Sequence, residues 1–281
     1  LLLPLTFFAL YVGLVVRDAG REAVEARSLS TWMPAVQRMS ALMGALQKER
    51  GRSSRFLASK EATDPNLQGF RKATDEGLQA WTEALKTLDP MPASWSKAEA
   101  LARELPGKMD QLRKAVDARA MAAPQVVAQY TGTIATLDAL LAGLAGEARR
   151  PEMVRRLQGL LHLNRAREAA GQERATLMAV FTADALLPAQ MERLAILTGS
   201  QQAHLRAFQE LCGAEGAGVL TEKVPPAMAD EVSGLRNQVV LAARPAGFGG
   251  NPETWWTLST KRIEALGEVE KILQQKLAED A

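Results

Sequence analysis

The sequence predicts an all-α protein of eight helices that form two four-helix bundles, preceded by part of a transmembrane helix. Apolar residues recur at steps of three and four over long stretches, as on one face of a helix. No stretch sustains the apolar and polar alternation of a half-buried strand, and aromatic residues make up only 5% of the chain. The hydrophobic fraction of 47% over 281 residues is enough for a sizeable core.

Helix-breaking residues, mainly proline and glycine, indicate where each helix begins and ends. The expected helices cover about 1–60 with a kink or restart at 30–34, 66–88, 93–118 with an interruption at Pro106-Gly107, 124–148, 151–184, 188–211, 226–243 and 252 to the end. Five of them carry a proline near the first turn, where its missing N–H has no helical partner to lose. Glycine-rich loops separate the last three helices.

The first sixteen residues, LLLPLTFFALYVGLVV, contain no charge, and Arg17 and Asp18 end this run. A bilayer span needs roughly 20 such residues. We interpret residues 1–16 as the C-terminal part of a transmembrane helix and 17–281 as a sensor domain. The alternatives are the core of a signal peptide, whose apolar run is this short, and an internal core helix.

Composition and motifs argue against several classes of protein. The formal net charge is +2 and the basic residues are scattered, so we expect no nucleic-acid partner. The single cysteine, Cys212, excludes an intrachain disulfide. His162 and His204 lack the glutamate spacing of a di-iron bundle, and no zinc or phosphate-loop motif is present. We therefore expect no metal, no cofactor and no enzymatic activity.

A short signature occurs twice, as QKERGRS at 47–53 and as GQERAT at 171–176. Counting from Arg50 or Arg174 in steps of three and four meets mostly apolar residues, so each arginine falls on the buried seam of its helix. A buried guanidinium is costly unless an anion pairs with it, and its planar fork of donors matches a planar anion. The placement in helices one and five is what a duplication would leave.

Two explanations account for these arginines. One is internal neutralisation, with Arg50 paired to a glutamate such as Glu173 and Arg174 paired to Glu49 or Glu168. The other is a small anion held between helices from both bundles. Glycines within the signatures would let the helices approach closely and leave room for such a ligand.

Three blocks carry a family resemblance: LQKERGRS at 46–53, EAAGQERA at 168–175, and WW at 255–256 followed by STKRI at 259–263. Together they resemble the NIT domain, which senses nitrate and nitrite, over about residues 36–277. The resemblance implies two four-helix bundles that bind nitrate or nitrite between them through arginines. The residues that it implies as ligands are Arg50, Arg52, Arg174 and Arg236, with Arg167, Ser53 and Arg262 as further candidates.

The apolar start together with this resemblance favours a membrane-bound bacterial receptor, such as a chemoreceptor or a sensor histidine kinase of a two-component system. We expect its sensor domain to lie in the periplasm, anchored in the inner membrane by the N-terminal helix, and to form a homodimer. The anion would draw the bundles together, and the last helix would transmit the change. The alternatives are a bundle that senses another small anion or an organic acid, and a structural helical domain that binds nothing.

Overall fold

The computed structural model describes residues 2–59, 62–242 and 247–279, with only the backbone described for 2–10 and 18–29. These residues hold helices and no strand, which confirms the all-α prediction. The helices are α1 (Leu2–Ala58), α2 (Leu67–Lys86), the short 3-10 helix η1 (Ala93–Trp95), α3 (Ala98–Asp117), α4 (Ala123–Glu147), α5 (Pro151–Ala183), α6 (Pro188–Lys223), α7 (Pro226–Val240) and α8 (Pro252–Glu279).

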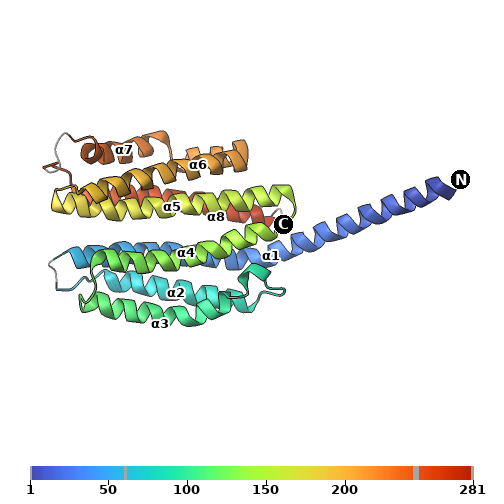
Figure 1. Cartoon of the computed structure of the whole chain (residues 1–281), viewed down its shortest axis with the longest axis horizontal. Helices are drawn as coiled ribbons and strands as arrows, with labels where there is room; N and C mark the ends of the chain where they lie inside the picture. The colour runs from blue at the N-terminus through green and yellow to red at the C-terminus, as the bar shows by residue number, and fades with distance from the viewer. Residues whose placement is uncertain (1, 60–61, 243–246, 280–281) are drawn as a thin grey trace.

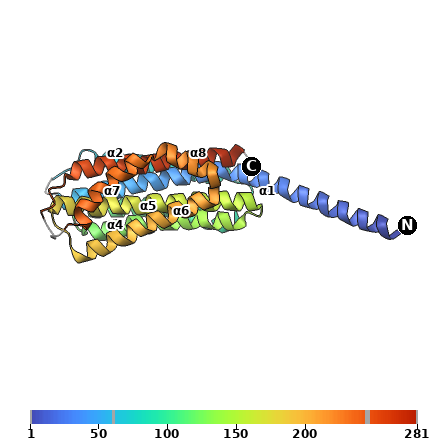
Figure 2. The ribbon, with the colours of Figure 1, turned by 90° about the horizontal axis from the view of Figure 1, so that it is seen from above.

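The helices α1 to α4 lie on one side of the body and α5 to α8 on the other, all roughly parallel to its long axis (Figure 1). The N-terminal part of α1 projects from the body as a single helix in both views (Figures 1 and 2). The C-terminal end of α8 lies beside the point where α1 enters the body. There Leu277 joins the same buried cluster as Trp32 and Met33.

Three expected breaks take a different form in the structure. Both α1 and α3 continue through their internal prolines, Pro34 and Pro106. A proline inside a helix costs about 3 kcal/mol, and here burial of the neighbouring apolar side chains outweighs that cost. The expected end of the sixth helix near residue 211 is replaced by a kink at Gly213 (φ 59°, ψ −154°), after which the helix resumes to Lys223. Only glycine adopts such a conformation without strain.

The hydrophobic core is divided by a polar layer. One large cluster occupies α1 to α4 and the first turns of α5, while two smaller clusters lie among α5 to α8. Between them, on α1 and α5, the buried residues include Glu49, Arg50, Glu173 and Arg174. The two signatures therefore interrupt the apolar core where α1 passes α5, and polar side chains this deeply buried need partners.

Over the part of the chain that the structure describes, no helix combines the length and the apolar character that a membrane crossing requires. The apolar residues 11–16 belong to a helix that continues without a break into charged sequence at Arg17. Leu1, the first residue of the expected transmembrane segment, lies outside the described residues.

Candidate functional site

The two signature arginines face each other's helices across the contact between α1 and α5. The side chain of Arg50 on α1 lies over Gly171 of α5, where a Cβ would stand 3.1 Å from its Nη2. The side chain of Arg174 on α5 lies over Gly51 of α1, where a Cβ would stand 3.3 Å from its Nη2. Each glycine thus makes room for the guanidinium of the other copy, whereas from the sequence we expected this space to hold the anion.

Arg50 is fully buried and neutralised by a carboxylate. Its guanidinium forms a bidentate pair with Glu168 of α5, one contact being Nη2 to Oε2 at 3.2 Å. Its Nη1 also donates to Thr131 of α4 at 2.9 Å. Two glutamine side chains donate to the same carboxylate, Gln47 at 2.9 Å and Gln172 at 2.7 Å. Arg50 therefore joins the two groups of helices through an internal ion pair.

Arg174 is equally buried, with 2% of its surface exposed, but it makes no ion pair with any described residue. Its Nη1 donates to Thr260 of α8 at 2.8 Å, and its guanidinium lies 4.4 Å from the ring centre of Trp256. Its Nε is buried without a hydrogen-bond partner in the described structure. Burial first, and the charge of Arg50 second, lower the pKa of Arg174 to about 10. A positive charge at this position is poorly compensated.

The glutamates that precede the two arginines are engaged in matching ion pairs. Glu49 of α1 accepts from Arg113 of α3, with Nε to Oε1 at 2.8 Å and Nη2 to Oε2 at 3.0 Å. Glu173 of α5 accepts from Arg236 of α7 through the same two donor nitrogens, the second at 3.2 Å. The expected neutralisation of Arg50 by Glu173, and of Arg174 by Glu49 or Glu168, is therefore not what the structure shows. Each of those glutamates has another arginine as partner.

The other residues expected at the site are distributed over several places. Arg52 pairs with Asp64 at 2.7 Å, away from the contact between α1 and α5, and Ser53 lies 3.4 Å from the hydroxyl of Tyr130. The Tyr130 hydroxyl in turn donates to Glu49 at 2.8 Å. Arg236 is occupied by Glu173. Within the described structure, the hydrogen bonds and ion pairs of these side chains go to residues other than Arg174.

Arg167 and Arg262 complete the set. Arg167 forms a buried ion pair with Glu270 of α8 and lines the same groove as Arg174. Arg262 donates to Gln201 at 2.7 Å and makes no ion pair among the described residues. Burial lowers the pKa of Arg262, against a smaller raising effect of Glu173. The structure therefore brings Arg50 and Arg174 together, leaves Arg167 nearby, and separates the rest.

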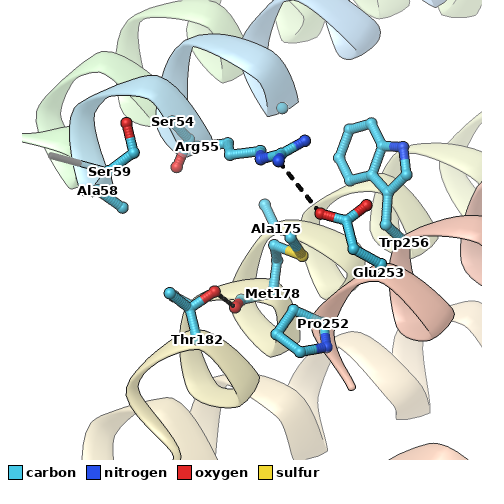
Figure 3. A pocket seen from close by; sticks show the side chains of 12 residues that line it. Ser54, Arg55, Ala58, Ser59, Ala175, Met178, Thr182, Pro252, Glu253 and Trp256 are labelled. Carbon is cyan, nitrogen blue, oxygen red and sulfur yellow. Dashed lines mark hydrogen bonds and ion pairs between the residues drawn. The ribbon is translucent and has the colours of Figure 1, made fainter. Parts of the chain in front are cut away.

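Two cavities adjoin Arg174. A groove of about 920 Å³ between α1 and α8 is lined by Arg174, Arg167, Lys48 and Glu264, among others. A smaller cavity of about 280 Å³ lies next to Gly51 and is shown in Figure 3, where Trp256 stands beside the ion pair of Arg55 with Glu253. Arg174 does not line this second cavity, because the ring of Trp256 covers its guanidinium on that side. The groove is thus the open approach to Arg174.

Sequence reasoning missed Arg113, Thr131 and Thr260 as partners of the signatures. Arg113 is not one of the buried, regularly spaced residues of α3, although it directly follows one of them, Leu112. The helix periodicity therefore gave no sign of its role. Thr260 could have been found, since it lies inside the STKRI block five residues after the tryptophan pair begins.

Comparison with known proteins adds two relatives. The chain is 27% identical over 239 residues to a nitrate regulatory protein of Klebsiella oxytoca, a match that covers 84% of this chain and 59% of that protein. The chain therefore spans less than two thirds of the length of this relative. It also matches the structure of the NasR transcription antiterminator with a TM-score of 0.84 and 24% identity, over 95% of this chain and 73% of that one. The second likeness shows the fold.

These relatives correct four expectations. A membrane-bound receptor of the chemoreceptor or two-component type, with a periplasmic sensor domain in the bacterial inner membrane, is wrong, because the relatives are a regulatory protein and a transcription antiterminator. The membrane as a partner is wrong for the same reason. The exclusion of nucleic acid, based on the low net charge and the scattered basic residues, is overturned by the likeness to a transcription antiterminator. The expected homodimer stays a prediction.

The family model described as nitrate and nitrite sensing matches residues 41–278, from the middle of α1 to the end of α8, and includes both signatures and the tryptophan pair. This match extends over more than four fifths of the chain and agrees with the motifs from which the sequence predicted it. The chain belongs to the NIT family of nitrate- and nitrite-sensing domains.

Proposed function

We propose that this chain binds nitrate or nitrite at Arg174, between α1, α5 and α8. The observation that carries this proposal is a buried guanidinium without an acidic partner among the described residues, open to a groove of about 920 Å³. A buried charge is stable only when paired, so this position favours an anion over water. Membership of a family described as nitrate and nitrite sensing supports nitrate or nitrite as this anion.

The donors around Arg174 suit a small planar anion. The guanidinium offers N–H groups in one plane, and nitrate spreads its charge over three oxygens that can accept two parallel bonds. Thr260 adds a hydroxyl at 2.8 Å from Nη1. Arg50 lies close enough to lower the pKa of Arg174, so the anion would also relieve repulsion between two like charges. The Glu168 carboxylate already neutralises Arg50, so Arg174 is the primary ligand.

The anion acts on the fold by stabilising one arrangement of the helices around Arg174. Since α1, α5 and α8 meet at this residue, an anion that binds them together shifts the population toward the closed arrangement. We infer that the chain supplies the sensing part of a nitrate-responsive regulator, which agrees with the name of the Klebsiella oxytoca relative.

Isothermal titration calorimetry tests the site. The protein is titrated with nitrate, nitrite, chloride, sulfate and acetate, and the titrations are repeated on Arg174→Ala, Arg50→Ala and Arg206→Ala. Arg206 is an exposed residue of α6 far from the signatures in the sequence and serves as the matched control. We expect nitrate or nitrite to bind to wild type and to the control, and neither to bind to Arg174→Ala.

Thermal unfolding of the same variants separates lost binding from lost folding. An anion at 100 times its dissociation constant raises the free energy of unfolding by about 2.7 kcal/mol, so nitrate raises the Tm of a protein that binds it. Arg174→Ala is expected to unfold cooperatively with a Tm that nitrate leaves unchanged. Heat from acetate but none from nitrate would indicate a sensor of organic acids and would overturn the proposal, as would nitrate binding that Arg174→Ala leaves intact.

A further inference from the structure

An ion pair joins α1 and α8 across the groove, about one helical turn along from Arg174. Lys48 of α1 and Glu264 of α8 meet at 2.9 Å, with side chains 45% and 54% exposed. Lys48 precedes Gly51, the residue under Arg174, by three positions, and Glu264 follows Thr260, the partner of Arg174, by four. Residues at these spacings share one face of a helix. The pair therefore lies about one helical turn along α1 and α8 from the level of Arg174, at the exposed rim of the groove that both line.

The position of this pair matters because the groove is the open side of Arg174. Trp256 covers the guanidinium on the side of the smaller cavity, and the arginine itself extends from α5. Lys48, Glu264 and Arg174 all line the same groove. An anion that arrives from solvent through the groove passes between α1 and α8 at the level of this ion pair.

The two members of the pair act on an anion in opposite ways. Glu264 repels it, and the charge of Glu264 opposes the lowering of the Arg174 pKa, although the two side chains form no ion pair in the described structure. Lys48 attracts the anion and holds Glu264 away from the guanidinium. If released, Glu264 could turn toward Arg174 and occupy the place of the ligand, because it lies one turn from Thr260.

We propose that the Lys48–Glu264 ion pair is a gate for the anion site, in which Glu264 opposes binding at Arg174 and Lys48 restrains Glu264. This inference rests on the proposed function. It assigns to Lys48 and Glu264 control of affinity and of the rate of access, and it predicts that substitutions of the two partners have effects of opposite sign. An ion pair that merely stabilised the fold would give effects of equal sign.

The test uses Glu264→Gln, Lys48→Gln and the double variant, with nitrate binding measured by calorimetry and by stopped-flow tryptophan fluorescence, for which Trp256 is the reporter. Glu268→Gln is the matched control. Glu268 lines the same groove one turn further along α8, is 54% exposed like Glu264, and pairs at 2.6 Å with a lysine, Lys271. Both variants remove one negative charge from the groove, but only one removes it beside Arg174.

We expect Glu264→Gln to bind nitrate about three- to tenfold more tightly than wild type, with most of the gain in the association rate, since charges at the rim of a site act on that rate. Lys48→Gln should bind about three- to tenfold more weakly. The loss caused by Lys48→Gln should be smaller in the Glu264→Gln background than in wild type, because only the direct attraction of Lys48 for the anion then remains. Glu268→Gln should change the affinity less than twofold, as a more distant exposed charge is screened by salt.

The outcomes separate this inference from the proposed function. If wild type binds neither nitrate nor nitrite, the proposed function fails and the gate with it. If wild type binds nitrate and Arg174→Ala does not, while Glu264→Gln and Glu268→Gln have equal effects, the site stands and the gate is overturned. Weaker binding in both Glu264→Gln and Lys48→Gln would also overturn it, since it would indicate a structural role.

Discussion

Arg174 and Gly51 are matched across the contact between α1 and α5, because a Cβ on residue 51 would lie 3.3 Å from Nη2 of Arg174 and 3.4 Å from the ring of Trp256. The absence of a side chain on α1 is thus what allows the guanidinium to lie between that helix and the indole. The same spacing relates Arg50 to Gly171 at 3.1 Å.

Gly51→Ala is expected to separate anion binding from stability. Alanine favours a helix over glycine by about 1 kcal/mol, so the free energy of unfolding without nitrate should stay constant or rise slightly. The added methyl group displaces the guanidinium by a few tenths of an ångström, so nitrate affinity should fall about fivefold or more. Calorimetry and urea denaturation measure the two quantities. Gly199→Ala in α6, where a Cβ meets nothing within 4 Å, should gain stability and keep its affinity. Equal affinities in the two variants would contradict this prediction.

Arg174→Met and Arg113→Met should differ sharply in stability without nitrate. Methionine at 174 removes a buried charge that has no acidic partner, so the free energy of unfolding should lie within about 1 kcal/mol of wild type or above it. Methionine at 113 leaves the fully buried Glu49 without its arginine, which should cost about 3–5 kcal/mol. Urea denaturation in a chloride-free buffer compares them. A large loss in Arg174→Met would show that its charge is compensated in the folded protein.

Glu168→Gln should make the stability of the protein more dependent on nitrate. The substitution leaves Arg50, which is fully buried, without its carboxylate, at a cost of about 3 kcal/mol. Two unpaired arginines then adjoin one another, and an anion near them restores more stability than in wild type. The shift in Tm on adding nitrate should therefore be larger in Glu168→Gln than in wild type. Asp138→Asn, at another partly exposed ion pair of the α4–α5 contact, should leave the shift unchanged.

His162 and His204 should make the fold less stable in mild acid. Their Nδ1 atoms lie 2.9 Å apart, and burial lowers the pKa of both below the ordinary 6.5, helped by Arg165. As the pH falls through about 6.5, the unfolded chain takes up protons that the folded chain does not, so the free energy of unfolding decreases. Urea denaturation at pH 7.5 and 5.5 measures the loss. In His162→Asn the loss should be smaller, and an unchanged loss would show that other groups cause it.

Most of the fold could be predicted from the sequence because the helix pattern and the prolines are local signals. Pro151, Pro188, Pro226 and Pro252 each begin a helix, as the pattern indicated. The differences occur where packing overrides a local signal. Leu105 and Met109 are buried on either side of Pro106, so α3 continues, and Gly213 kinks α6 instead of ending it.

The site could be predicted only in part. The apolar positions at steps of three and four, together with the doubled signature, indicated that Arg50 and Arg174 are buried between helices. The structure confirms their burial. Which carboxylate meets which arginine depends on the rotation and offset of one helix against another, and helix periodicity carries no such information. For that reason Glu168 was assigned to the wrong arginine, and Arg113 was not found.

Glu49 pairs with Arg113, and Glu173 pairs with Arg236. In both halves of the chain, therefore, an ion pair joins the first helix of that half to the third. The arginines that follow these glutamates differ, because Glu168 fills the position beside Arg50 and no described carboxylate fills the one beside Arg174. A doubled motif would suggest a binding stoichiometry of two. Because a resident carboxylate already fills one of the two positions, we expect one anion per chain.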